Sequence, residues 1–535
     1  MNVLKHPSFF RPANHHSSAP PTSNSSPPTS RPHSSNGSER AARPHNKLSL
    51  SGFRRSSPSP SVSMNIVPTT LVQDGSYLEL LNLKLSEAVS RALAQPSGPA
   101  AVHEQLSGKR PIPAGRGHAL GSFIASELKA TQDSPHLHRA IIRTLHRPLS
   151  VLLTNLSAHL VPLISSPAFQ HAPAPSVHSP NLNPTQIHAI AIATFVGELL
   201  ETFDDFELGT DIDLRGDGLK LIREGLVSLI NRVVGPMINT IRNELMPLLE
   251  ALEMPNSLQG TKAVPGIRGL TAHHPSIVVL QAIMPIYAKT ITRFTTSAAS
   301  QTALATFLIS IVWRGLVALA HRPYVPASPP TSPGLVPAAL KKSRGATPPP
   351  LTPPAARFNI KLPPSRPPSP NHIIPASAAA DARALFDLLS LLPRPMGDKE
   401  STRLAREVVD DAFEGLQALP DLLDAVHTVP AKLDSQERLD QVARELEILA
   451  TKVPLLIALP VVLQAPTNGT STVVVSSLIG LSATQYRKEC LSGFGRAEEC
   501  ATTVALRIQD VLPNNPDVHP VVSKWLDMEI TEALN

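Results

Sequence analysis

The chain has 535 residues, a net charge of +6 and a mean hydropathy near zero, and its composition is uneven along its length. Of its 56 prolines, half fall in residues 1–75 and 322–380. The two cysteines, Cys490 and Cys500, are too few for a disulfide-rich secreted scaffold and favour a reducing compartment. By length alone the chain has room for two to four domains.

The two proline-rich segments are also strongly basic. Residues 1–73 carry eight Lys or Arg against the single acid Glu39, and residues 322–380 carry seven Lys or Arg and no acid. Each segment therefore has a net charge of +7, which leaves −8 for the rest of the chain. Such a composition buries too little apolar surface to offset the entropy of ordering, so we predict that 1–75 and 322–380 are disordered. Their charge suits an anionic partner, and it equally suits a solvated linker.

Elsewhere, apolar residues recur at spacings of three and four, which is typical of amphipathic helices. Aromatic residues make up only 4% of the chain, so the predicted core is aliphatic. In chain order the pattern predicts helices near 77–95, 118–130, 135–147, 149–164 and 185–204.

The clearest helical pattern lies in residues 217–253. A heptad rhythm runs through Leu219, Ile222, Leu226, Leu229 and Val233, and a second one through Ile238, Ile241, Leu245, Leu248 and Leu252. Gly235-Pro236 stands between them, and proline normally ends or kinks a helix. We therefore predict two antiparallel helices that meet at this dipeptide.

Further helices are predicted near 276–296, 299–321, 381–392, 399–418, 434–452, 496–512 and 517–533. The segment 454–482 fits either short helices or a strand pair, and we favour helices. The fold class that follows is all-α, as an irregular helical bundle or a short α-solenoid. We predict a disordered tail at 1–75, a helical domain at 76–321, a disordered linker at 322–380 and a second helical domain at 381–535.

Patterns that carry catalytic chemistry are missing from the sequence. The Gly-x-Ser-x-Gly, P-loop and Gly-x-Gly-x-x-Gly motifs are absent. Gly115-Arg116-Gly117 precedes a predicted helix, where a phosphate can bind free amides, but no strand precedes it, so we predict a helix-capping loop. We therefore predict a non-enzyme with no cofactor.

Metal-binding patterns are incomplete. Asp211 and Asp213 match the start of an EF-hand loop, but Arg215 and Ile222 occupy positions that must supply oxygen ligands. The 20 histidines are scattered, and the two cysteines lie ten residues apart. Because a structural zinc site needs four converging ligands, we predict no metal site.

The proline-rich segments contain the one positive signal for regulation. Ser-Pro or Thr-Pro pairs predict phosphorylation at Ser57, Ser59, Ser328, Ser332, Thr347, Thr352 and Ser369. Each phosphate adds about −1.5 to −2 charges, so about four would neutralise a segment of +7. Lys361, Pro364 and Pro367 match a polyproline ligand with its orienting cation.

The function that these features favour is a non-enzymatic helical scaffold or adaptor that binds partner proteins through helix faces. The alternative is a membrane-associated organelle protein anchored through the apolar segment 303–320, in which Arg314 is unfavourable. The basic N-terminus has no apolar signal region, so we expect a cytoplasmic or nuclear protein, with a mitochondrial one as the alternative. Aromatic residues do not interleave with the basic ones, which argues against specific nucleic-acid recognition.

Overall fold

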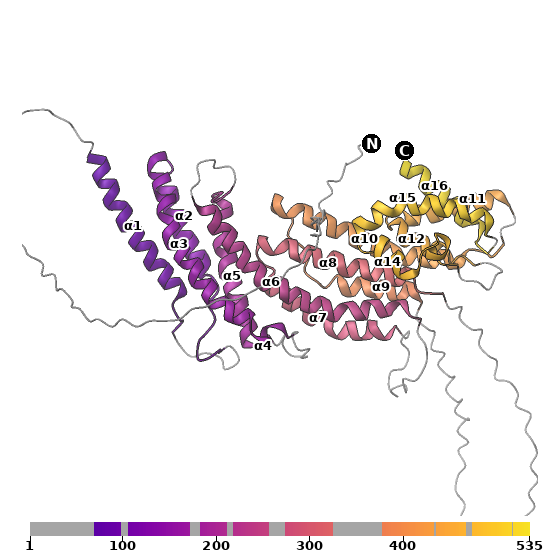
Figure 1. The fold of residues 1–535 in the computed structure, drawn as a ribbon, viewed down its shortest axis with the longest axis horizontal. Coiled ribbons are helices and arrows are strands. Elements are labelled where there is room, and N and C mark those ends of the chain that lie inside the picture. Colours follow the sequence, from indigo (N-terminus) through magenta and orange to yellow (C-terminus); the bar gives the residue numbers. More distant parts are fainter. Residues whose placement is uncertain are drawn as a thin grey trace, which may run out of the picture. The chain divides into compact units, whose positions relative to one another are not determined.

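The computed structural model describes residues 69–97, 105–171, 182–210, 218–255, 273–324, 377–432, 435–466, 473–515 and 517–534. Within these ranges every regular element is a helix, and one isolated bridge joins Leu106 to Lys109. The predicted all-α fold class is therefore confirmed (Figure 1). Residues Ser76–Asn535 form one compact unit.

The helices up to Arg322 are α1 (Thr69–Leu93), α2 (Arg116–Ala130), α3 (Pro135–Ile164), α4 (Pro167–Gln170), α5 (Pro184–Asp205), α6 (Leu219–Glu250), the 3-10 helix η2 (Ala251–Glu253), α7 (Pro275–Phe294) and α8 (Ala298–Ala320). Those that follow are α9 (Ala378–Leu389), α10 (Glu400–Thr428), α11 (Gln436–Ala450), α12 (Leu455–Val462), α13 (Val475–Leu478), α14 (Ala483–Cys490), α15 (Phe494–Val511), the 3-10 helix η3 (Leu512–Asn514) and α16 (Pro520–Leu534).

Helix α6 corrects the prediction of two helices that meet at Gly235-Pro236. It is one helix of 32 residues that runs through Pro236 and Pro247. Met237, which the heptad pattern skipped, is buried and continues the row of apolar residues from Val233 to Ile241. The apparent change of register is the drift of a helix with 3.6 residues per turn away from a repeat of 3.5.

Two other helix breaks that were predicted at prolines are also wrong. Helix α3 passes through Pro148, where the sequence predicted two helices, and α10 passes through Pro420 to end at Thr428. A proline in a helix interior costs about 3 kcal/mol. Both prolines are buried among apolar side chains on either side, and that continuous burial outweighs the lost hydrogen bond.

The segment 454–482 is helical where it is described, as α12 and α13, so the favoured prediction is confirmed. Helix α14 was not predicted, because its sequence is polar and only eight residues long. Its N-cap, Ser482, accepts a hydrogen bond from the Gln485 N–H at 3.1 Å, which starts the helix.

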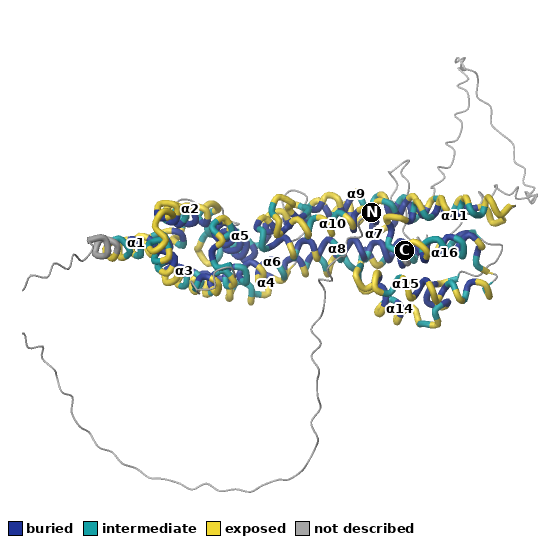
Figure 2. Tube along the Cα trace, turned by 90° about the horizontal axis from the view of Figure 1, so that it is seen from above, coloured by how far each residue is buried: buried dark blue, intermediate teal, exposed yellow. Residues whose placement is uncertain are grey.

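The helices pack in series. Helix α2 lies on α5, α5 on α6, α6 on α8, α8 on α10, α10 on α11 and α11 on α16 (Figures 1 and 2). Serial contacts of this kind are typical of irregular solenoids. Helix α8 also contacts α9 and α12, so helices from the two predicted domains pack against each other. The boundaries predicted at 321 and 381 stay predictions.

Glycines allow α2 and α5 to approach closely. A Cβ on Gly117 would lie 2.2 Å from the Phe195 carbonyl oxygen, and one on Gly121 would lie 2.1 Å from Thr202 Oγ1. Neither position therefore has space for a side chain while the two helices keep this separation.

Candidate functional site

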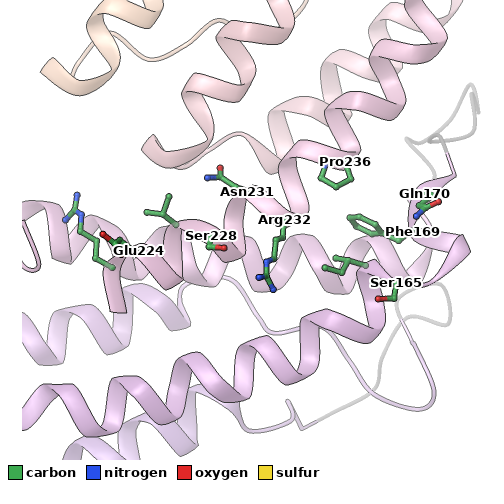
Figure 3. Close-up of a pocket in the computed structure, with 11 residues that line it drawn as sticks. Ser165, Phe169, Gln170, Glu224, Ser228, Asn231, Arg232 and Pro236 are labelled. Atoms are coloured by element: carbon green, nitrogen blue, oxygen red, sulfur yellow. The ribbon is translucent and has the colours of Figure 1, made fainter. Parts of the chain in front are cut away.

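A groove opens where the end of α3 and α4 face α6 (Figure 3). This α4–α6 groove has a volume of about 910 Å³. It is lined by Ile164, Ser165, Phe169, Gln170, Arg223, Glu224, Val227, Ser228, Asn231, Arg232 and Pro236. The lining mixes apolar, amide, hydroxyl and charged groups, which suits binding of a peptide or side chain more than it suits a reaction.

A second groove lies between α5, α6, α8 and the start of α10. This α5–α8 groove has a volume of about 640 Å³. Arg223, Val227 and Asn231 line both grooves, so α6 separates them. Ser297, Thr302, Thr306 and Ser401 add hydroxyl groups to the second groove.

The two acids that line the α5–α8 groove, Glu201 and Asp204, lie beside basic side chains. Asp204 accepts a hydrogen bond from Arg223 at 2.5 Å and lies 3.6 Å from Lys399 Nζ. Glu201 lies 3.5 Å from His118. Thr306 donates to a backbone carbonyl of its own helix. Among the described residues that line this groove, no hydroxyl is hydrogen-bonded to a histidine or carboxylate that would activate it as a nucleophile.

The N-terminus of α2 holds an anion that belongs to the protein itself. The Glu198 carboxylate accepts hydrogen bonds from the N–H groups of Gly115 at 2.8 Å and Gly117 at 2.9 Å. Free amides and the helix dipole favour a negative charge at this position. The predicted capping loop is thus confirmed, and a carboxylate from α5 takes the place that a phosphate would occupy.

The most buried ionic group is Asp381, in the first turn of α9. One carboxylate oxygen accepts from Arg322 Nη1 at 2.5 Å, and the other accepts the His274 N–H at 3.1 Å and lies 3.2 Å from His273 Nδ1. Burial lowers the pKa of His274, and the charge of Arg322 lowers it further, against the opposing charge of Asp381. Its Nδ1 accepts the Ser276 N–H at 3.2 Å, as expected for a neutral ring that caps α7.

Sequence analysis found only scattered histidines, and the structure shows that His273 and His274 lie in a buried ionic group. Their partners Arg322 and Asp381 lie 48 or more positions away, and no local pattern connects them. The four groups tie α7, α8 and α9 together inside the fold. Within the described ranges no three His, Cys, Asp or Glu side chains are placed to hold a metal ion.

The two cysteines lie in neighbouring helices, Cys490 at the end of α14 and Cys500 in α15. Burial, together with the nearby Cys500, raises the pKa of the Cys490 thiol to about 11. The thiol is therefore protonated at neutral pH and is a poor nucleophile.

The remaining predicted site residues lie outside the described ranges. These are the phosphorylation candidates Ser57, Ser59, Ser328, Ser332, Thr347, Thr352 and Ser369, the docking candidates Lys361, Pro364 and Pro367, and the acidic loop 211–217. Their predictions stay as the sequence analysis left them.

Two described helices, α7 and α8, are long and apolar enough to cross a membrane by length and composition. In α8 the most apolar stretch is 72% buried by the surrounding helices, and Arg314 donates to Glu250 from Nε at 2.9 Å. This burial favours the interpretation of 303–320 as a core helix. In α7 the corresponding stretch is only 44% buried.

Comparison with known proteins assigns no family to the chain. No family model matches the chain, and no curated protein matches it. Among solved structures it is similar to the crystal structure of the C-terminal domain of the exocyst subunit Sec6p, at 9% identity and a TM-score of 0.35. That alignment covers 86% of this chain and 98% of the other. At this TM-score the likeness carries no argument about fold or function.

Proposed function

We propose that the chain is a non-enzymatic helical scaffold or adaptor that binds partner proteins through exposed helix surfaces. The observation that carries this proposal is the outer side of α7. Val278 and Val279 are 55% and 45% exposed, and Ala282 and Pro285 continue the exposed apolar surface one and two turns later. We call these four residues the α7 apolar face.

Helix α7 is one of the two described helices that are long and apolar enough to cross a membrane. The opposite side of α7, with Ile277, Leu280 and Met284, is fully buried, so the helix already fills its place in the core. Contiguous exposed apolar surface often marks a protein interaction site. Burial of apolar surface by a partner helix is a common mode of recognition.

The two grooves support the same function. Both have polar and charged linings, and Asp204 of the α5–α8 groove is paired with Arg223 and Lys399. Such linings provide directional hydrogen bonds around an apolar contact, as at most protein interfaces.

The test compares partner capture by the full chain and by the variant Val278→Glu/Val279→Glu. Both residues are exposed, so the variant is expected to fold with an unchanged melting temperature while losing the captured partner. The matched control is Leu221→Glu/Ile448→Glu, which introduces the same charges at isolated exposed apolar residues of α6 and α11. Equal capture by both variants and the wild type would overturn the proposal. So would turnover of a metabolite by a purified chain from which no partner is recovered.

The basic segments supply the proposed regulation. Phosphorylation at Ser57, Ser59, Ser328, Ser332, Thr347, Thr352 and Ser369 would remove their positive charge and weaken any contact with an anionic partner. The test replaces all seven with alanine and measures partner capture after kinase treatment. A variant that responds to the kinase as the wild type does would exclude these sites.

The second candidate function is a membrane-associated protein anchored through 303–320, and the hydropathy of α7 and α8 favours it. It requires α8 to leave its contacts with α6 and α10. Alkaline carbonate extraction separates the two candidates, because a scaffold is extracted and a spanning helix stays with the membrane. For the scaffold we propose a cytoplasmic or nuclear location, to be tested by fractionation.

A further inference from the structure

Helix α3 carries a row of exposed basic side chains. Its 30 residues contain three arginines, four histidines and no acidic residue. Three arginines and two histidines are exposed on the helix: His136, Arg139, Arg143, His146 and Arg147. We call them the α3 basic row, and Figure 2 shows exposed residues along this helix.

The arginines of this row have no partner within the described part of the chain, in contrast to two arginines of α10. Arg139, Arg143 and Arg147 make no hydrogen bond or ion pair with a described residue. On α10, by comparison, Arg403 lies 3.0 Å from Glu400, and Arg406 lies 2.6 Å from Asp410.

The arginines of the row also repel one another. Arg139, Arg143 and Arg147 follow one another at four-residue spacing, so like charges face each other along the surface. The packing of α3 uses its opposite side, where Ile141, Leu145, Leu149 and Leu152 are buried. Nothing in the described fold accounts for the row.

We propose that the α3 basic row binds an acidic helical segment of a partner protein. Four residues of helix rise by about 6 Å, so carboxylates at the same spacing on a second helix match the three arginines over about 12 Å. Arginine pairs with carboxylates through two parallel hydrogen bonds, which favours this geometry over a diffuse charge contact. Val151, one turn beyond Arg147, is 52% exposed and extends the row with apolar surface.

The chain's own segments are poor occupants of the row. Residues 1–73 and 322–380 each carry a net charge of +7 and are repelled by it. Residues 211–217 carry three Asp and one Arg, a net charge of −2 that does not balance three arginines. Aromatic residues that would stack on nucleic-acid bases are absent from α3. A separate acidic chain therefore fits best.

This inference rests on the proposed adaptor function and names a class of partner for it. The test measures, at low ionic strength, how two synthetic peptides of identical composition bind to the full-length chain. One peptide has Glu at every fourth residue of an Ala- and Leu-rich helix, and in the other the same residues are scrambled. The basic segments bind both peptides equally, so the difference between the peptides reports the row.

The wild type is expected to bind the patterned peptide at least about tenfold more tightly than the scrambled one. In Arg139→Glu/Arg143→Glu/Arg147→Glu this preference is expected to disappear. The control Lys289→Glu/Arg293→Glu/Arg507→Glu reverses three exposed cations of α7 and α15 and should keep the preference. Circular dichroism and melting of each variant show that it is folded.

Equal binding of the two peptides to the wild type would overturn the inference, as would loss of the preference in the control. Binding through these arginines to phosphatidylserine vesicles or to a DNA duplex, more tightly than to the patterned peptide, would also overturn the proposed partner class. The variant Val278→Glu/Val279→Glu should keep the peptide preference. The proposal for the α7 apolar face and the proposal for the α3 basic row can therefore be refuted independently of each other.

Discussion

Arg322 and Asp381 form an ion pair of 2.5 Å although 59 positions separate them in the chain. Their side chains are only 6% and 0% exposed. Arg322 follows the end of α8 and Asp381 lies in the first turn of α9, so the pair fixes the start of the second helical region against the end of the first. The pair is anchored further by the His274 N–H.

We expect Asp381→Asn to lower the free energy of unfolding by about 3 kcal/mol, because it leaves the buried Arg322 without a counter-charge. Urea denaturation of the full chain measures this. The control is Asp421→Asn, which removes an exposed partner of Arg383 and should cost less than about 1 kcal/mol. Similar losses of unfolding free energy in Asp381→Asn and Asp421→Asn would contradict the prediction that the buried ion pair contributes more than the exposed one.

Gly117→Ala is expected to destabilise the protein by about 3 kcal/mol, because its Cβ would lie 2.2 Å from the Phe195 carbonyl oxygen. Gly495→Ala, in the exposed first turn of α15, meets nothing within 4 Å. It should raise stability by about 0.5 to 1 kcal/mol through helix propensity. Thermal melting of both variants tests whether close packing of α2 on α5 requires glycine at 117. Melting temperatures that shift in the same direction in both variants would contradict this requirement.

Glu529 makes stability depend on pH. Burial, together with the negative charges of Glu532 and Glu447, raises the pKa of its carboxyl from 4.5 to about 7. The folded state therefore holds a proton that the unfolded state releases, and stability falls as pH rises from about 4.5 to about 7.

Because Glu529 is only partly buried, we expect Glu529→Gln to gain no more than about 1 kcal/mol at pH 8, and almost nothing at pH 4.5. Chemical denaturation at the two pH values measures the difference. Glu498→Gln, at an exposed position of α15, should leave the pH profile unchanged. A gain by Glu529→Gln that is equal at both pH values would contradict the assignment.

The α3 basic row predicts a gain in stability when its charge is broken. Arg143→Glu converts two repulsive pairs, with Arg139 and Arg147, into attractive ones, and should raise the free energy of unfolding by about 1 kcal/mol at low salt. High salt should remove the gain. Arg403→Glu is the opposite case, because Arg403 lies within 3.3 Å of both Glu400 and Glu407, and it should destabilise. A loss of stability in Arg143→Glu would show that Arg139 and Arg147 do not repel Arg143 measurably.

Local sequence patterns were sufficient to predict most helices and the all-α class. The apolar spacing of α5, α8 and α15 is a property of consecutive residues, and the structure places these helices within a few residues of their predicted ends. The same patterns failed at Pro148, Pro236 and Pro420, where local chemistry favours a break. Pro148 and Pro420 are buried against the rest of the fold, whereas Pro236 is exposed and lies between the buried residues Val234 and Met237 of α6. No local pattern shows that burial.

For the charge of the candidate surfaces, too, sequence determined one part and tertiary structure the other. Sequence alone determined that α3 contains no acid and that the proline-rich segments are basic, because charge is a property of composition. Only the tertiary structure decided which charges are neutralised. It brought Glu198 to the Gly115 and Gly117 amides and Asp381 to Arg322, and it left Arg139, Arg143 and Arg147 facing solvent. Ion pairs form between groups that folding brings within a few ångströms, and folding sets those distances through packing over the whole chain.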